Sequence, residues 1–195
     1  NPSNKTTWRN FILNHFKYIF ACDFFTVPLF NFKVLYIFFI IRLSTREIIH
    51  IKATCHPVKS WITEQISSAF INRLIPRKKQ YLIHDNDMLF SQINFGQFPV
   101  KHVAISFHAP KMNAYAERFV KSIKRECTDH FIFFNEKHAD SIVDEYKTYY
   151  NRFRPHQGIS QKTPLDYNVL SCGEVKSVRI LNGLHHHYYR ELKAA

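Results

Sequence analysis

The apolar run from Val34 to Ile41 constrains the fold more than any other feature of the sequence. It consists of eight β-branched, aromatic or leucine residues, whereas a membrane helix needs about 20. The run is therefore predicted to be a buried strand within Phe32–Leu43. Similar residues fill Tyr18–Val27 and Thr45–Lys52, and short polar segments separate the three runs. The sequence predicts three successive antiparallel strands.

A helix, two strands and two further helices are predicted to follow. Apolar residues at helical spacing after Pro57 indicate an amphipathic helix that ends before Pro76. The expected strands are Tyr81–Ile83 and Val100–Ile105, and the expected helices are Asn113–Phe131 and Lys137–Asn151. The predicted order is β-β-β-α-β-β-α-α, which describes an α/β fold.

The two ends of the chain are expected to extend this core. Thr6–Phe16 has the pattern of a short lead-in helix, and proline and glycine residues make Arg152–Tyr167 an ordered loop. Asn182-Gly183 predicts a hairpin of Val175–Leu181 and Leu184–Tyr189. The predicted division is a lead-in helix (residues 1–16), a central core (17–167) and a C-terminal hairpin (168–195).

The charge indicates a polyanionic partner. Lysine and arginine number 27 against 15 acidic residues, a net charge of +12, which favours nucleic acid binding. The four cysteines are scattered and are expected to be reduced, mostly buried thiols. With no signal-peptide pattern, we expect an intracellular, cytoplasmic protein, associated with the nucleoid if prokaryotic. The initial Asn suggests a piece of a longer product.

Three carboxylates occupy positions that suit a metal site. Asp23 lies inside an apolar strand, Asp85 follows a short strand, and Glu117 lies in the first turns of a helix. Taken singly, Asp23 could be ion-paired, solvated or metal-binding, and Glu117 could simply favour the helix dipole. Together they could converge on two Mg²⁺ or Mn²⁺ ions, which prefer hard oxygen ligands and support phosphodiester chemistry.

Four segments resemble the integrase core of DDE transposases and retroviral-type integrases. They are Cys22-Asp-Phe-Phe-Thr-Val27, Ile83-His-Asp-Asn-Asp-Met-Leu-Phe90, Pro110-Lys-Met-Asn-Ala-Tyr-Ala-Glu-Arg-Phe-Val-Lys-Ser-Ile-Lys-Arg-Glu126 and Tyr150-Asn-Arg-Phe-Arg-Pro-His-Gln-Gly158. The resemblance implies a ribonuclease H-like fold with a mixed five-stranded sheet flanked by helices, to which the C-terminal hairpin would be added. It also implies that Asp23, Asp85 and Glu117 bind the metal ions and that Asp87 is a neighbour.

The same resemblance implies DNA strand transfer and cleavage. The expected partners are transposon ends and target DNA, in a homo-oligomer, with no membrane and no small-molecule substrate. Polar and basic residues around the catalytic helix are expected to bind DNA, chiefly through its phosphates. They are Lys111, Asn113, Arg118, Lys121, Lys124 and Arg125. The run His185–His187 is expected to be exposed.

Two alternatives remain open from the sequence. Only 31 residues separate Asp85 from Glu117, fewer than is usual in the family, which could displace Glu117. One alternative is therefore a catalytically inactive DNA-binding remnant of a mobile element. The other is a ribonuclease H-type nuclease that cleaves RNA–DNA hybrids, although the segment around Glu117 argues against it.

Overall fold

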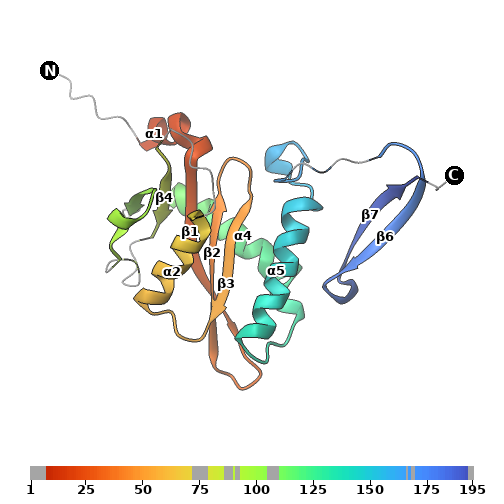
Figure 1. Ribbon diagram of the computed structural model, residues 1–195, viewed down its shortest axis with the longest axis horizontal. Helices are drawn as coiled ribbons and strands as arrows, with labels where there is room; N and C mark the ends of the chain where they lie inside the picture. Colours follow the sequence, from red (N-terminus) through yellow and green to blue (C-terminus); the bar gives the residue numbers. More distant parts are fainter. Residues whose placement is uncertain are drawn as a thin grey trace.

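A five-stranded mixed sheet forms the centre of the molecule (Figure 1). The computed structural model describes residues 8–71, 79–85, 90, 93–104, 110–165, 167 and 170–192. The strand order is β3-β2-β1-β4-β5, with β1, β2 and β3 antiparallel and β1, β4 and β5 parallel. The strands are β1 Ile19–Pro28, β2 Val34–Arg42, β3 Ile48–Thr54, β4 Tyr81–His84 and β5 Lys101–Ala104. The predicted ribonuclease H-like architecture is confirmed.

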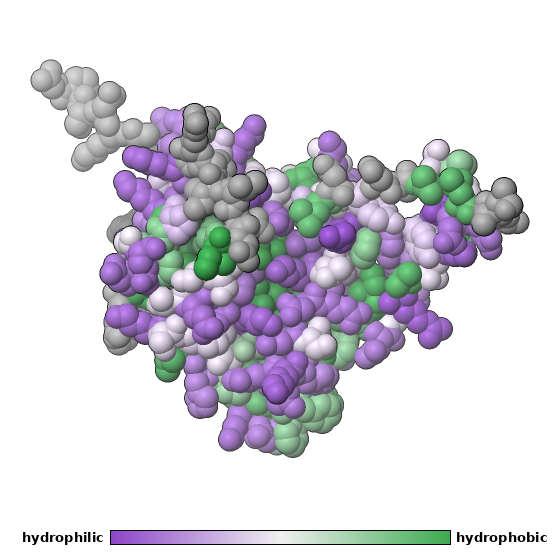
Figure 2. All heavy atoms as spheres, viewed as in Figure 1, coloured by the Kyte–Doolittle hydropathy of each residue, from purple (hydrophilic) through white to green (hydrophobic). Residues whose placement is uncertain are grey.

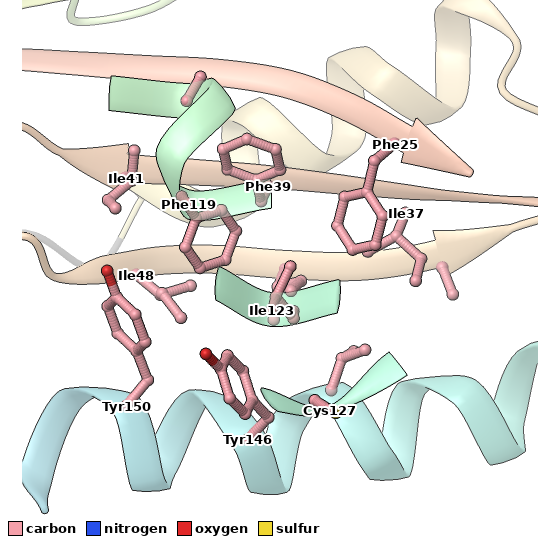
Figure 3. Packing of buried hydrophobic residues seen from close by; sticks show 14 of the residues in the cluster. Phe25, Ile37, Phe39, Ile41, Ile48, Phe119, Ile123, Cys127, Tyr146 and Tyr150 are labelled. Atoms are coloured by element: carbon pink, nitrogen blue, oxygen red, sulfur yellow. The ribbon is translucent and has the colours of Figure 1, made fainter. Parts of the chain in front are cut away.

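Helices cover both faces of the sheet. Helix α2 (Lys59–Phe70) packs on one face, while α4 (Pro110–Glu126) and α5 (Glu136–Arg152) pack on the other. Side chains alternate along β1, so that Phe20 and Cys22 join the α2 side and Ala21 and Phe25 join the α4 side. Figure 3 shows the core between the sheet, α4 and α5. Each face therefore has its own apolar core.

Helix boundaries differ slightly from the prediction. Helix α1 spans Trp8–His15, and α4 begins at Pro110, three residues earlier than predicted. Proline is compatible with a first helical turn because the amide hydrogen it lacks would have no partner there. Helix α4 ends at Glu126 instead of Phe131, and a 3₁₀ turn follows over Thr128–His130. The order of the elements is as predicted.

Side chains of α5 satisfy the outer edge of β3. A β-bulge after Ile48 disturbs the pairing with β2, and Asn151 compensates. Its Oδ1 accepts from Ile48 N at 2.8 Å, and its Nδ2 donates to Ile48 O at 2.9 Å. We define the polar stripe as the α5 side chains that bond this edge: Glu136 to Cys55 N, Asp140 to Ala53 N, Lys147 to Ile49 O, and Asn151 to Ile48. The helix thus takes the place of a sixth strand.

The predicted C-terminal hairpin forms a separate two-stranded sheet beside α5 (Figure 1). Its strands are β6 Glu174–Ile180 and β7 His185–Glu191. The last strand pair is Ile180 with His185, so the loop has four residues, two more than an Asn-Gly turn would need. Leu181 adopts a left-handed conformation, is buried, and donates its N–H to Glu145 Oε1 at 2.7 Å. Docking on α5 therefore decides the shape of the loop.

The expectation of an exposed histidine run is wrong for two of the three residues. His185 stacks on Tyr149 with ring centroids 4.4 Å apart, and its Nε2 donates to Glu126 O at 2.6 Å. His187 stacks on Phe153 at 4.0 Å, and only His186 is exposed. The two rings contribute to docking of the hairpin.

The face shown in Figure 2 is largely hydrophilic. Hydrophobic residues gather at its lower end, near the turn between β1 and β2, where Phe30 and Phe32 are exposed. Cys22 and Cys127 are buried free thiols as predicted, whereas Cys172 is exposed. No helix in the described ranges is both long enough and apolar enough to cross a bilayer.

Candidate active site

Asp23 lies in β1 on the sheet face that α4 covers. The alternation of side chains puts it between Ala21 and Phe25, both of which belong to the core under α4. The carboxylate is half-buried, and its Oδ1 accepts the Phe24 N–H at 2.8 Å. Strand β4 pairs with β1 only over Ile19–Ala21. Asp23 therefore lies where the sheet opens on the β4 side.

Asp85 follows β4 at the same opening. Strands β1 and β4 pair in parallel, with Phe20 opposite Leu82 and Ala21 opposite Ile83. Asp23 and Asp85 each lie two residues beyond the last pair of this register, so both acids follow the same end of the paired segment. Burial and then the charges of Asp23 and Asp85 raise the pKa of Cys22 well above its usual value.

Glu117 reaches the same side of the sheet from α4. Two contacts set the path of this helix: Phe119 lies 4.5 Å from Phe39, and Lys124 Nζ lies 6.0 Å from the Phe25 ring. Phe39 is the β2 partner of Asp23, so α4 passes directly over the acid. Glu117 is exposed and shares a helix flank with Lys124, seven residues later.

The structure does not unite all three acids. Within the described ranges, no three His, Cys, Asp or Glu side chains are grouped closely enough to hold a metal ion. Asp23 and Asp85 follow the same end of the β1–β4 pairing, and Glu117 lies on the helix that covers this face of the sheet. Asp87 lies outside the described residues.

The donors available at this opening are carboxylate oxygens. Cys22 points to the opposite face, and its raised pKa keeps the thiol protonated. His84 is also on that face, where its ring stacks on Phe95 at 4.9 Å and its Nδ1 hydrogen-bonds to Asp85 O at 2.6 Å. Carboxylates without thiolate or imidazole suit Mg²⁺ or Mn²⁺ rather than Zn²⁺.

Helix α4 divides its basic residues between two flanks. Lys121 and Lys124 lie on the flank of Glu117, whereas Arg118 and Arg125 lie on another. Arg125 is exposed and pairs with Glu126 at 3.3 Å. The side chains of Lys111 and Asn113 lie outside the described residues. The predicted DNA-binding residues therefore form at least two groups.

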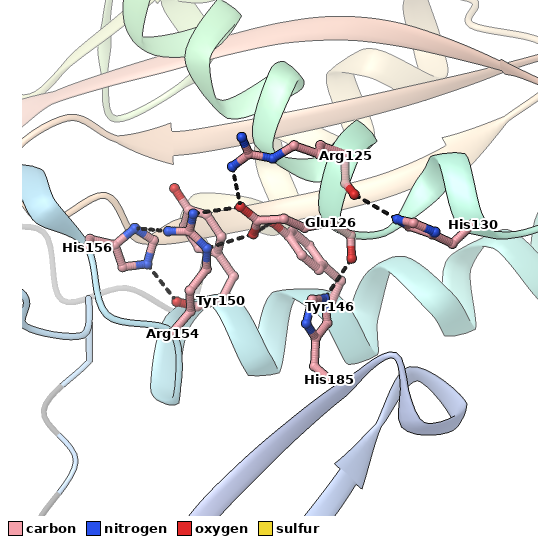
Figure 4. Close-up of polar contacts among 8 residues, drawn as sticks. All are labelled: Arg125, Glu126, His130, Tyr146, Tyr150, Arg154, His156 and His185. Carbon is pink, nitrogen blue, oxygen red and sulfur yellow. Dashed lines mark hydrogen bonds and ion pairs between the residues drawn. The ribbon is translucent and has the colours of Figure 1, made fainter.

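A buried polar network joins the ends of α4 and α5 (Figure 4). Arg154 donates to both oxygens of Glu126, from Nε at 2.6 Å and from Nη2 at 2.7 Å, and the Tyr146 hydroxyl donates to Glu126 at 3.0 Å. Although burial raises the pKa of Glu126, these bonds and the charge of Arg154 lower it overall. Glu126 closes the third segment that resembles the integrase core and Arg154 and His156 lie in the fourth, but the sequence did not predict that they bond to one another.

Comparison with known sequences gives a match over part of the chain. Residues 99–164 match a family model described as "Integrase core domain". This part of the chain is therefore similar to integrase core domains. The matched segment includes β5, α4, α5 and the Arg154–His156 network.

Solved integrase and transposase cores share the fold of this chain. The catalytic core domain of BIV integrase is 11% identical, with a TM-score of 0.51, and the match covers 76% of this chain and 91% of that one. The catalytic domain of the Mos1 mariner transposase is 10% identical, with a TM-score of 0.59, covering 72% and 74%. A chain of the simian T-cell lymphotropic virus intasome, solved with PP2A regulatory subunit B56 gamma, is 11% identical, with a TM-score of 0.59, covering 90% and 67%.

A mobile-element protein is similar to part of this chain. It is the insertion element IS476 uncharacterized 39.2 kDa protein of Xanthomonas euvesicatoria, 28% identical over 71 residues. The match covers 36% of this chain and 20% of that relative, so the chain matches only a small part of the curated relative.

Proposed function

We propose that this chain is an integrase or transposase core that cuts and joins DNA strands with two divalent metal ions bound by Asp23, Asp85 and Glu117. The observation that carries the proposal is the parallel register of β1 and β4, which ends two residues before Asp23 and two before Asp85 and so supports a site at that opening of the sheet. The influence of both charges on Cys22 supports the same site. The path of α4 over Asp23 supports Glu117 as the third ligand.

The residues of the chain divide the work between holding the ions and holding the DNA. Bound Mg²⁺ or Mn²⁺ would lower the pKa of the attacking water or 3′-hydroxyl and stabilise the leaving oxygen. Asp23 and Asp85 would anchor the ions from the rigid sheet, and Glu117 would complete the site from α4. Lys121 and Lys124, on the flank of Glu117, would hold phosphates of the reacting strand.

We also propose the partners and setting of the reaction. The substrates are transposon ends and target DNA, and the protein acts in the cytoplasm as a homo-oligomer. The net charge of +12 supports a polyanionic substrate. The intasome chain, which shares the fold, comes from an assembly and so supports the proposed oligomer.

Metal-dependent nicking tests the proposed acids without knowledge of the DNA ends. Labelled generic duplex DNA is incubated with Mn²⁺ and the wild-type, Asp23→Asn or Glu117→Gln protein. Each substitution should reduce nicking by about 100-fold or more, because a neutral amide holds a divalent ion poorly. Glu64→Gln is the matched control, since Glu64 is an exposed glutamate of α2, on the other side of the sheet. It should nick at the wild-type rate.

Two outcomes would contradict the proposal. Nicking that survives in Glu117→Gln would remove Glu117 from the site. Tight, salt-sensitive binding without nicking by any of the proteins would favour a silent DNA-binding remnant, the alternative that the separation of Glu117 from the aspartates supports.

A further inference from the structure

A small basic pocket lies on the flank of α4 away from Glu117. Its volume is about 200 Å³, and it is bounded by the β2–β3 turn, α4 and the loop after α5. The polar lining includes Arg46, Arg118, Ser122, Arg154, His156 and Gln157. Arg118 and Gln157 are exposed, so the pocket opens to solvent. None of the acids proposed for catalysis lines it.

The pocket carries an excess of positive charge. Three guanidinium groups line it, and only that of Arg154 has a carboxylate partner, Glu126. Neither Arg46 nor Arg118 makes an ion pair within the described part of the chain. Burial and the charges of Arg154 and Arg46 lower the pKa of His156 to about 4, so the ring is neutral at pH 7. Two arginine charges are therefore available to an anion.

Three elements hold Arg46 in position. Its backbone is left-handed, with φ of 65°, which is uncommon for a residue with a side chain. Its guanidinium lies 4.1 Å from the centre of the Tyr115 ring of α4. A Cβ atom on Gly158 would lie only 3.2 Å from Arg46 Nη2, so glycine leaves room for the guanidinium. Local strain combined with tight packing is typical of a ligand site.

We propose that this pocket binds a phosphate group of the DNA backbone. That the pocket binds a phosphate group follows from its lining residues alone. That this phosphate belongs to DNA rests on the proposed function. Guanidinium forks match phosphate oxygens, and the free guanidinium groups of Arg46 and Arg118, from two different elements, can hold a tetrahedral anion between them. The volume is below that of pockets for drug-sized ligands, which suits a single phosphate group. Such a contact would position the DNA without reading its sequence.

Inorganic phosphate tests the chemistry of the pocket. Thermal unfolding is followed while phosphate replaces chloride at constant ionic strength. The wild-type Tm should rise with phosphate, because a ligand that binds only the folded state stabilises it. Arg46→Asn should lose this rise, and asparagine tolerates the left-handed turn. Arg118→Gln changes an exposed side chain and should weaken the rise. Arg179→Gln, an exposed arginine of β6, is the control and should respond as the wild type does.

DNA binding at several salt concentrations tests the source of the phosphate. Loss of one phosphate contact should make the slope of log K against log[salt] shallower by about one for Arg46→Asn and Arg118→Gln, and leave Arg179→Gln unchanged. An equal rise in Tm with phosphate in the wild type and all variants would contradict a phosphate site in this pocket. A phosphate response with unchanged DNA slopes would overturn DNA as its source. Neither measurement depends on DNA cleavage. An inactive catalytic centre would therefore abolish nicking in the first assay without changing the results expected for the pocket.

Discussion

His156 is held in one neutral tautomer by its two hydrogen bonds. Arg154 Nη1 lies 2.9 Å from Nδ1, and because arginine can only donate, Nδ1 must accept. The proton therefore resides on Nε2, which donates to Tyr150 O at 3.0 Å (Figure 4). Protonation of Nδ1 would break the bond to Arg154 and place two positive charges together. The buried ring is thus a point of acid sensitivity.

Stability should fall as the pH drops from about 6.5 towards 4. Burial and the charge of Arg154 lower the pKa of His156 to about 4, from 6.5 in the unfolded chain. Between these two pH values the unfolded state binds more protons than the folded state, so the free energy of unfolding rises with pH. The stabilising contribution of neutral His156 is fully present above pH 6.5 and is lost as the pH falls towards 4. His156→Gln should remove about 1–3 kcal/mol of this pH dependence.

Urea unfolding at several pH values measures the effect of His156→Gln. His186→Gln is the control, since His186 is exposed. Identical pH profiles for wild type and His156→Gln would show that this histidine does not carry the effect. His50 and His84, whose pKa values burial also lowers, would leave a smaller slope in the variant.

The importance of a single residue could be predicted where neighbouring residues in the sequence reveal it. It could not be predicted where it depends on a contact with a residue far away in the chain. Asp23 stands out in the sequence because a carboxylate interrupts an apolar strand. Arg46 does not, because its importance depends on Tyr115 and Gly158, which are far away in the chain. The roles of Asp23, Asp85 and Glu117 as metal ligands remain predictions.

At the scale of elements, Asn151 should contribute more than an ordinary helix residue. It satisfies both backbone groups of Ile48 at the bulge of β3 and is itself buried. Asn151→Ala would leave a buried N–H and C=O without partners, so we expect a loss of about 2–4 kcal/mol in the free energy of unfolding. Asn31→Ala, in the exposed β1–β2 turn, should cost far less. Urea midpoints with unchanged m-values would measure both, and equal losses would contradict the role of Asn151.

Most elements could be predicted because their periodicity is local. The three apolar runs and the two amphipathic helices appear where the sequence places them. The bulge after Ile48 and the polar stripe could not be predicted, because they depend on residues about a hundred positions apart. The predicted length of the hairpin loop was wrong for the same reason. Burial of Leu181 against the core outweighs the local preference of Asn-Gly for a two-residue turn.

At the scale of the whole molecule, the C-terminal hairpin should depend on its anchor at Leu181. A two-stranded sheet alone is marginally stable in water. Leu181→Ala removes a buried side chain and should cost about 2–4 kcal/mol. Leu184→Ala, a half-exposed leucine of the same loop, is the matched control and should cost much less. Urea unfolding measures the cost, and limited proteolysis should cleave the Leu181→Ala hairpin first. A hairpin as resistant as that of the control would contradict the anchoring role.

The division into residues 1–16, 17–167 and 168–195 remains a prediction. The hairpin has its own sheet, yet His185 caps the last turn of α4, so it belongs to the packing of the core as well. Composition gave no indication of this docking, because aromatic stacking on Tyr149 and Phe153 requires the folded α5.

The polar stripe also limits how copies of this chain can associate through the central sheet. Side chains of α5 bond backbone groups of β3 at Ile48, Ile49 and Ala53, whereas β5 has a single neighbour among the described strands. A strand from another copy would have to displace these side chains before it could pair along β3. Edge-to-edge pairing of two copies is therefore favoured at β5, and a symmetric pair of this kind stops at two chains.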